Sequence, residues 1–104
     1  MDVTIRDRTE EAPEATRSYL EERLRLLGRH FDLVRSADVE LDQERQRSRQ
    51  PLHVVEINLR LVGPRLEGIR ARETGRDLKA AVDLALDKID EEIVELKERV
   101  RPHP

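Results

Sequence analysis

Arginine is the residue type with the clearest chemical potential in this sequence, because its guanidinium group matches the geometry of phosphate. Arginines outnumber lysines 17 to 3, and residues 45–72 form a basic block between two acidic segments. Within this block, Arg45, Arg47 and Arg49 alternate with polar residues. The block is where a phosphate contact would lie, and such contacts position a protein without reading sequence. Two alternatives stay open: a GC-rich genome as the cause of the arginine excess, and a solvated loop at residues 45–49.

The residue types that usually catalyse reactions or bind metals are absent or isolated. The chain has no Cys, and His30, His53 and His103 lack the spacing of metal-binding or protease motifs. No serine lies in a nucleophile elbow, and the four glycines do not form a phosphate-binding loop. We therefore predict that the protein is not an enzyme and has no catalytic residue, metal site, cofactor or small-molecule substrate.

Composition narrows the possible partners and location. Aromatic residues make up 2% of the chain, which excludes base-stacking platforms built from several aromatic side chains. No apolar run approaches the roughly 20 residues of a membrane span, and the N-terminal residues do not resemble a signal peptide. We therefore expect a cytoplasmic protein without a membrane partner. The net charge of −3 does not by itself indicate a nucleic-acid-binding protein.

Two helices are predicted from apolar residues at steps of three and four. The first begins with Pro13 at its first helical position and runs to about Leu27, with Gly28 as its stop. Its apolar side consists of Ala15, Tyr19, Leu20, Leu24, Leu27 and Phe31. Asp77 is the expected N-cap of the second helix. The apolar face of that helix consists of Leu78, Val82, Ala85, Ile89, Ile93, Leu96 and Val100.

Four strands are predicted from alternating apolar and polar residues, at residues 2–6, 37–42, 55–61 and 69–72. A polar loop is expected at residues 43–51. Gly63 and Pro64 end the third strand, and Thr74 and Gly75 lead into the second helix.

The resulting order, β-α-β-β-β-α, predicts one α+β domain over residues 1–104 with a short polar tail at about 101–104. A helical crossover makes the first two strands parallel, so the four-stranded sheet is mixed. Each strand has one apolar face, so both helices must pack on one face of the sheet. The expected core consists of Val3, Ile5, Tyr19, Leu27, Phe31, Val39, Val55, Ile57, Leu59, Val82, Ile89 and Ile93.

Several segments resemble the ribosome hibernation-promoting factors, also described as ribosome-associated translation inhibitors. Residues 77–89, D-L-K-A-A-V-D-L-A-L-D-K-I, are similar to that family's second helix. Residues 15–24, followed by Phe31 and Asp32, resemble its first helix and the end of that helix. Glu44 and Arg45 resemble the Glu-Lys pair that closes its second strand. The length fits the family's short form, which lacks a C-terminal dimerisation domain.

The resemblance implies both a fold and a function. The fold would be the same β-α-β-β-β-α arrangement, which is similar to a double-stranded-RNA-binding domain with an extra strand. The function would be to bind the small ribosomal subunit in the mRNA/tRNA channel and repress translation during dormancy or stress. The implied partners are ribosomal RNA (rRNA) and the neighbouring ribosomal proteins.

The resemblance also implies which residues contact rRNA. Basic positions of the family are matched on the helices by Arg17, Arg23, Lys88, Lys97 and Arg99. Arg25 and Arg29 are basic residues close to them in sequence, and Arg45 takes the place of the family's lysine at the strand end. The expected rRNA-binding residues are therefore Arg17, Arg23, Arg25, Arg29, Arg45, Lys88, Lys97 and Arg99.

The second helix departs from the family in charge. Glu91, Glu92 and Glu95 stand where the family commonly has Arg, Gln and Lys, and Leu26 stands where a Lys is usual. Acidic groups repel phosphate, so the alternative function is a protein–protein interaction module on the same fold that has lost rRNA binding. The acidic stripe is predicted to pair with Lys88 and Lys97; docking on a basic protein and a Mg²⁺-bridged approach to rRNA stay open. The stripe consists of Asp83, Asp87, Glu91 and Glu95.

The sheet face away from the helices also allows two interpretations. One is a lattice of ion pairs between neighbouring strands. The other is a basic edge on the third and fourth strands that touches rRNA phosphate. The outward residues are Arg6, Asp38, Glu40, Asp42, Glu56, Asn58, Arg60, Arg70 and Arg72.

Overall fold

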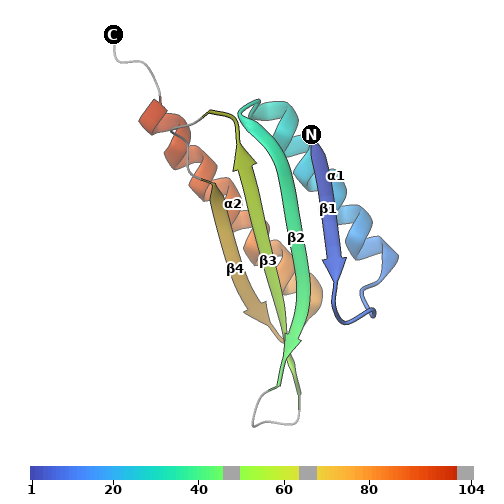
Figure 1. Ribbon diagram of the computed structural model, residues 1–104. Coiled ribbons are helices and arrows are strands. Elements are labelled where there is room, and N and C mark those ends of the chain that lie inside the picture. Colours follow the sequence, from blue (N-terminus) through green and yellow to red (C-terminus); the bar gives the residue numbers. More distant parts are fainter. Residues whose placement is uncertain (46–49, 64–67, 101–104) are drawn as a thin grey trace.

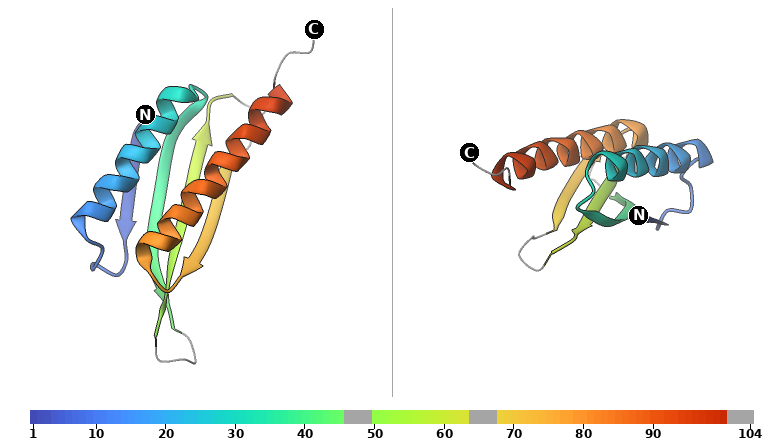
Figure 2. Two further views of the ribbon diagram at one scale, coloured as in Figure 1. Left: turned by 180° about the vertical axis from the view of Figure 1, so that it is seen from behind. Right: turned by 90° about the horizontal axis from the view of Figure 1, so that it is seen from above.

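The computed structural model consists of a four-stranded sheet with two helices on one of its faces (Figure 1). It describes residues 1–45, 50–63 and 68–100. The elements are β1 (Asp2–Asp7), α1 (Glu14–His30), β2 (Val34–Glu44), β3 (Leu52–Leu61), β4 (Ile69–Gly75) and α2 (Leu78–Val100). Seen from behind, α1 lies over β1 and β2, and α2 lies over β3 and β4 (Figure 2). The predicted α+β class and element order are confirmed.

The strand order in the sheet is β1-β2-β3-β4. β1 pairs with β2 in parallel, with Ile5 opposite Val39. The other two pairs are antiparallel: Val39 lies opposite Ile57, and Ile57 lies opposite Ala71. The crossover through α1 is what allows the parallel pair, since a short turn can join only antiparallel strands. The predicted mixed sheet is therefore confirmed.

The hydrophobic core lies between the sheet and the helices. Alternate residues of β2, such as Ala37, Val39 and Leu41, are buried, as are Leu20 and Leu24 of α1. Eight of the twelve predicted core residues are buried, and the other four are partly buried and pack against this cluster. The partly buried four are Val3, Ile5, Tyr19 and Leu27. The predicted core is confirmed.

The predicted boundaries of α1 are wrong at both ends. Pro13 is the N-cap, with an extended backbone (φ −60°, ψ 146°), and is not the first helical residue. Gly28 does not stop the helix, which continues to His30. Gly28 instead allows the Met1 side chain to lie close to the helix, since a Cβ at this position would lie 2.7 Å from the Met1 sulfur. Ala15 is exposed and does not belong to the apolar side, because the buried stripe begins at the next turn.

The β2–β3 hairpin is longer than the sequence pattern predicts. Gln43 and Glu44 belong to β2 and pair with His53 and Leu52 of β3, in a segment predicted to be a loop. Strands pair through backbone hydrogen bonds, which every residue except proline can donate and accept, so polar side chains do not prevent strand formation. For the same reason β4 continues to Gly75, which pairs with His53 and does not lead into the helix. Residues 46–49, 64–67 and 101–104, which include Arg47, Arg49, Pro64 and the predicted tail, lie outside the described residues.

Asp77 caps α2 as predicted. Its carboxylate Oδ2 accepts a hydrogen bond from the backbone N–H of Ala80 at 3.2 Å. This bond satisfies one of the N–H groups that a helix start leaves without a partner. The chain is thereby turned from the end of β4 into the helix that covers β3 and β4.

Candidate functional site

The two helices run in the same direction, side by side, on the covered face of the sheet (Figure 2). Three contacts show this direction, because residues further along α1 meet residues further along α2. The Tyr19 hydroxyl lies 2.7 Å from Asp83 Oδ1, and Arg23 Nη2 lies 3.3 Å from Asp90 Oδ2. At the end of α1, Phe31 lies under Lys97, whose Nζ is 5.5 Å from the ring centroid. All but one of the predicted rRNA-binding residues belong to these helices.

Three of the predicted residues, Arg23, Arg25 and Arg29, line one shallow hollow on α1. The hollow has a volume of about 370 Å³ and is also lined by Tyr19, Glu22 and Leu26. The side chain of Leu26 is 47% exposed, so an apolar spot lies among the guanidinium groups. Arg25 Nη1 also donates to the carbonyl oxygen of Met1 at 3.3 Å. The arrangement offers several cationic donors from a single helix.

Arg17 lies apart from this hollow. At 100° per residue, it is separated from Arg23 by about 120° around the helix, with the buried Leu20 and Leu24 between them. Its side chain is half-buried on the flank of α1 opposite to α2. The structure therefore does not place Arg17 and Arg23 on one surface, although the resemblance implies that both contact rRNA.

The basic residues of α2 are also divided. Lys88 pairs within the helix with Glu91 at 3.9 Å and Glu92 at 3.6 Å. Lys97 lies about 180° around α2 from Lys88, on the side that faces α1. Arg99 is exposed in the last turn of α2. The helix thus does not present these cations as a single patch.

Arg45 is the one predicted contact outside the helices. It is exposed and directly follows β2. The β2–β3 hairpin projects past the N-terminal ends of both helices (Figure 1). Arg45 is therefore remote from Arg29 and Arg99, which lie near the helix C-termini.

A network of polar side chains joins the two helices at Tyr19. The Tyr19 hydroxyl donates to Asp83 and accepts from Arg23 Nη1 at 2.9 Å. Lys79 Nζ lies 3.0 Å from the other Asp83 oxygen and 5.0 Å from the Tyr19 ring centroid. The hydrogen bond from Tyr19, and then that from Lys79, hold the pKa of the Asp83 carboxyl below its usual range. The hydrogen bond between Lys79 and Asp83 also raises the pKa of Lys79.

This network corrects the predicted pairing of the acidic stripe. Asp83 pairs with Lys79 and Tyr19 and not with Lys88, because it lies on the side of α2 that faces α1. Lys97 is not a partner of the stripe among the described residues, since it lies over Phe31. Only the pairing of Lys88 with Glu91 is confirmed. The Lys79–Asp83 spacing of four is visible in the sequence, but the role of Tyr19 depends on how the helices pack.

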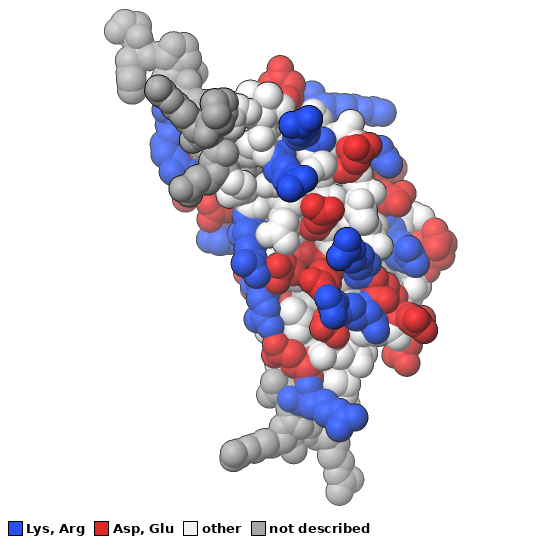
Figure 3. Space-filling model, in the orientation of Figure 1, with Lys and Arg blue, Asp and Glu red and all other residues white. Residues whose placement is uncertain are grey.

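The open face of the sheet carries cations and carboxylates side by side (Figure 3). Arg8 pairs with Glu40, Arg72 pairs with Glu44, and Arg70 lies 2.9 Å from Glu56. Hydrogen bonds from the Asn58 amide and from Arg70 lower the pKa of Glu56. These pairs favour the ion-pair lattice over a basic edge.

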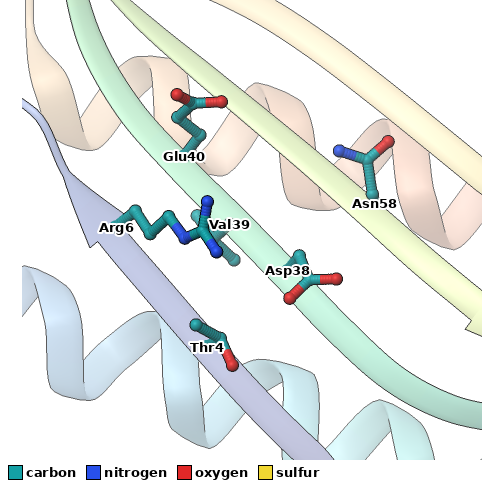
Figure 4. Close-up of a pocket in the computed structure, with 6 residues that line it drawn as sticks. All are labelled: Thr4, Arg6, Asp38, Val39, Glu40 and Asn58. Atoms are coloured by element: carbon teal, nitrogen blue, oxygen red, sulfur yellow. The ribbon is translucent and has the colours of Figure 1, made fainter.

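The same face has a second small hollow, of about 250 Å³, over β1 and β2. Arg6 reaches across β2, with its guanidinium between Asp38 and Glu40, and Thr4 and Asn58 lie at the margin (Figure 4). A phosphate here would face two carboxylates. Among the residues that the structure describes, no group of three or more His, Cys, Asp or Glu side chains is placed to hold a metal ion.

Neither described helix has the long apolar stretch that crossing a bilayer needs.

The sequence profile of the family described as "Sigma 54 modulation protein / S30EA ribosomal protein" matches residues 3–101. The chain is 30% identical to a protein of Azotobacter vinelandii named "Ribosome hibernation promoting factor", over 95% of this chain and 85% of that protein. It is 34% identical to the "Ribosome hibernation promotion factor" of Deinococcus radiodurans, over 88% of this chain. The match spans only 47% of the Deinococcus protein.

Solved structures share the fold. A "ribosomal subunit interface protein" from Coxiella burnetii superposes with a TM-score of 0.75, over 94% of this chain and 99% of the other, at 18% identity. The N-terminal domain of Protein Y from Thermus thermophilus gives a TM-score of 0.65, over 92% and 99% of the two chains, at 26% identity. The first likeness concerns the fold alone.

Proposed function

Because the chain belongs to the Sigma 54 modulation protein / S30EA ribosomal protein family, we propose that it is a ribosome-associated hibernation factor. It represses translation by occupying a site on the ribosome and carries out no chemical reaction. The relatives from Azotobacter vinelandii and Deinococcus radiodurans are both named for ribosome hibernation, which supports this proposal. As a ribosome-bound factor it would act in the cytoplasm.

The site we propose is the small subunit, in the channel used by mRNA and tRNA. The observation that carries this proposal is the hollow on α1, where Arg25 and Arg29 line the surface together with the exposed Leu26. Guanidinium groups on a rigid helix can meet successive phosphates of rRNA, and such contacts fix the position of a protein without reading its bases. Ribosomal proteins that neighbour this rRNA would complete the interface.

A second candidate function is supported by the charge of α2. This helix carries more acids than bases, and Glu91, Glu95 and Glu98 are exposed. Such a surface repels phosphate and suits a basic protein. The alternative is therefore a protein-interaction module on the same fold that does not bind rRNA.

Pelleting with purified ribosomal subunits distinguishes the two functions. The protein should sediment with small subunits at low salt and be released as salt rises, because phosphate contacts release counterions on binding. Purified large subunits serve as the control and should leave the protein in the supernatant. A protein that stays in the supernatant with small subunits at low salt would contradict rRNA binding and favour the interaction module.

A further inference from the structure

Arg23 differs from the other arginines of the α1 hollow in its contacts with α2. Its Nη1 donates to the Tyr19 hydroxyl at 2.9 Å, and its Nη2 lies 3.3 Å from Asp90 Oδ2. Its side chain is 34% exposed, whereas that of Arg70, in an ion pair on the open sheet, is 65% exposed. The guanidinium of Arg23 is thus partly covered and engaged at both terminal nitrogens.

Tyr19 connects this arginine to a second cation. Its hydroxyl accepts from Arg23 and donates to Asp83, while Arg23 and Lys79 lie 5.7 and 5.0 Å from its ring centroid. Lys79 pairs in turn with the second oxygen of Asp83. Arg23, which pairs with Asp90, and Lys79, which pairs with Asp83, therefore both lie over one aromatic ring. Each charge of this cluster faces an opposite charge. Arg23 of α1 faces Asp90 of α2, and Lys79 faces Asp83 one turn further along α2.

A phosphate that approached Arg23 would meet this balanced cluster and not a lone cation. The Tyr19 hydroxyl and the Asp90 carboxylate each take an N–H of one terminal nitrogen, and the negative charge of Asp90, 3.3 Å from Nη2, opposes a phosphate at the remaining N–H groups. Arg25 and Arg29 have neither of these contacts with α2 among the described residues.

We infer that Arg23 is a positioning residue, which fixes α2 against α1 through Tyr19 and Asp90, and that it is not a ligand of phosphate. The inference rests on the proposed function, since it divides the arginines of the proposed rRNA surface into two kinds. Arg25 and Arg29 meet phosphate, and Arg23 holds the second helix in place. The same cluster neutralises Asp83 and Asp90, so these two acids of α2 do not oppose the approach of rRNA.

The salt dependence of small-subunit binding tests this assignment. A variant that removes one phosphate contact should make the slope of log K against log salt shallower by about 1. Arg29→Gln is the matched control and should show that change. Arg23→Gln should leave the slope at its wild-type value, even where the affinity falls. A slope for Arg23→Gln that is shallower by as much as that for Arg29→Gln would overturn the inference.

A double-mutant cycle tests the contact between Arg23 of α1 and Asp90 of α2 without ribosomes. Urea denaturation midpoints are measured for wild type, Arg23→Gln, Asp90→Asn and the double variant. We expect the shift of the double variant to be clearly smaller than the sum of the two single shifts, because either change breaks the same contact. Additive shifts would overturn the inference. If wild type binds no small subunits at any salt, the proposed function fails, and the cycle alone decides the role of Arg23.

Discussion

The carboxylate of Asp7, at the end of β1, accepts a hydrogen bond from the backbone N–H of Ala12 at 2.8 Å. The other carboxylate oxygen accepts from the backbone N–H and the hydroxyl of Thr9, at 3.0 and 2.6 Å. One side chain thereby holds the whole connection from β1 to α1. Within that connection Glu10 has a φ of 58°, a left-handed conformation that a non-glycine residue adopts only when its surroundings hold it there.

Asp7→Ala should destabilise the protein by about 1–3 kcal/mol, because three donors are left without a charged acceptor. The effect should depend on pH. Burial opposes ionisation of Asp7, but the hydrogen bonds from Thr9, Ala12 and Glu10 outweigh it and hold the pKa below the ordinary value of 3.8. A lowered pKa gives stability that is present above that value and is lost as pH falls through the folded-state pKa. The difference in denaturation midpoint between wild type and Asp7→Ala should therefore narrow as pH falls from 7 to 2. A difference that is constant with pH would contradict the role of the ionised carboxylate.

Leu59→Ala should cost about 2–5 kcal/mol, as expected for a large-to-small change in a packed core. Leu59, two residues before the end of β3, is 1% exposed. Leu84→Ala is the control, since Leu84 is 50% exposed on α2 and should change stability by less than about 0.5 kcal/mol. Urea denaturation measures both. Equal midpoints for the two variants would show that Leu59 does not belong to the core.

Gly68→Ala should destabilise the protein by about 1–3 kcal/mol, as overpacking does. A Cβ at Gly68 would lie 2.8 Å from the backbone carbonyl oxygen of Leu59, which cannot move without disturbing β3. Gly28→Ala is the matched comparison, because the Cβ there would meet the flexible side chain of Met1. The loss in melting temperature should be larger for Gly68→Ala. A larger loss for Gly28→Ala would mean that Met1 is held more rigidly than the β3 backbone.

Arg25→Glu combined with Arg29→Glu should weaken binding to small subunits most strongly at low salt, because two cations of the α1 hollow become anions. Arg6→Glu with Arg60→Glu changes the net charge equally on the open sheet face and is the control. Co-sedimentation at several salt concentrations measures both variants. Equal losses would mean that binding depends on overall charge and not on α1.

Glu91→Arg combined with Glu95→Lys should tighten small-subunit binding at low salt, provided that this flank of α2 lies near rRNA. Glu91 and Glu95 are exposed, and Glu91 has a single weak contact with Lys88 at 3.9 Å, so little stability is lost. Weaker binding would instead indicate that the acids dock on a basic ribosomal protein. Unchanged binding would mean that Lys88 and Arg99 do not contact the ribosome.

Periodicity is sufficient to predict the core and the fold. Ala37, Val39 and Leu41 alternate along β2, while Ile89 and Ile93 follow the helical repeat, and both patterns report only on burial. The candidate site is less predictable. The role of Arg23 depends on its contact with Asp90 of α2. The distance between these two side chains depends on how the helices pack, which no local sequence pattern shows. For the same reason the local pattern predicts a helix stop at Gly28, although its role is to make room for Met1.

The common direction of α1 and α2 also has an electrical consequence. Each helix carries a macrodipole, with partial positive charge at its N-terminus and partial negative charge at its C-terminus. Because the helices are parallel, these dipoles add, and one end of the molecule is a positive pole and the other a negative pole. Arg29 of α1 and Lys97 and Arg99 of α2 occupy the last turns, where cations offset the negative pole. The protein thus has an electrical axis fixed by its backbone, and side-chain cations offset its negative pole.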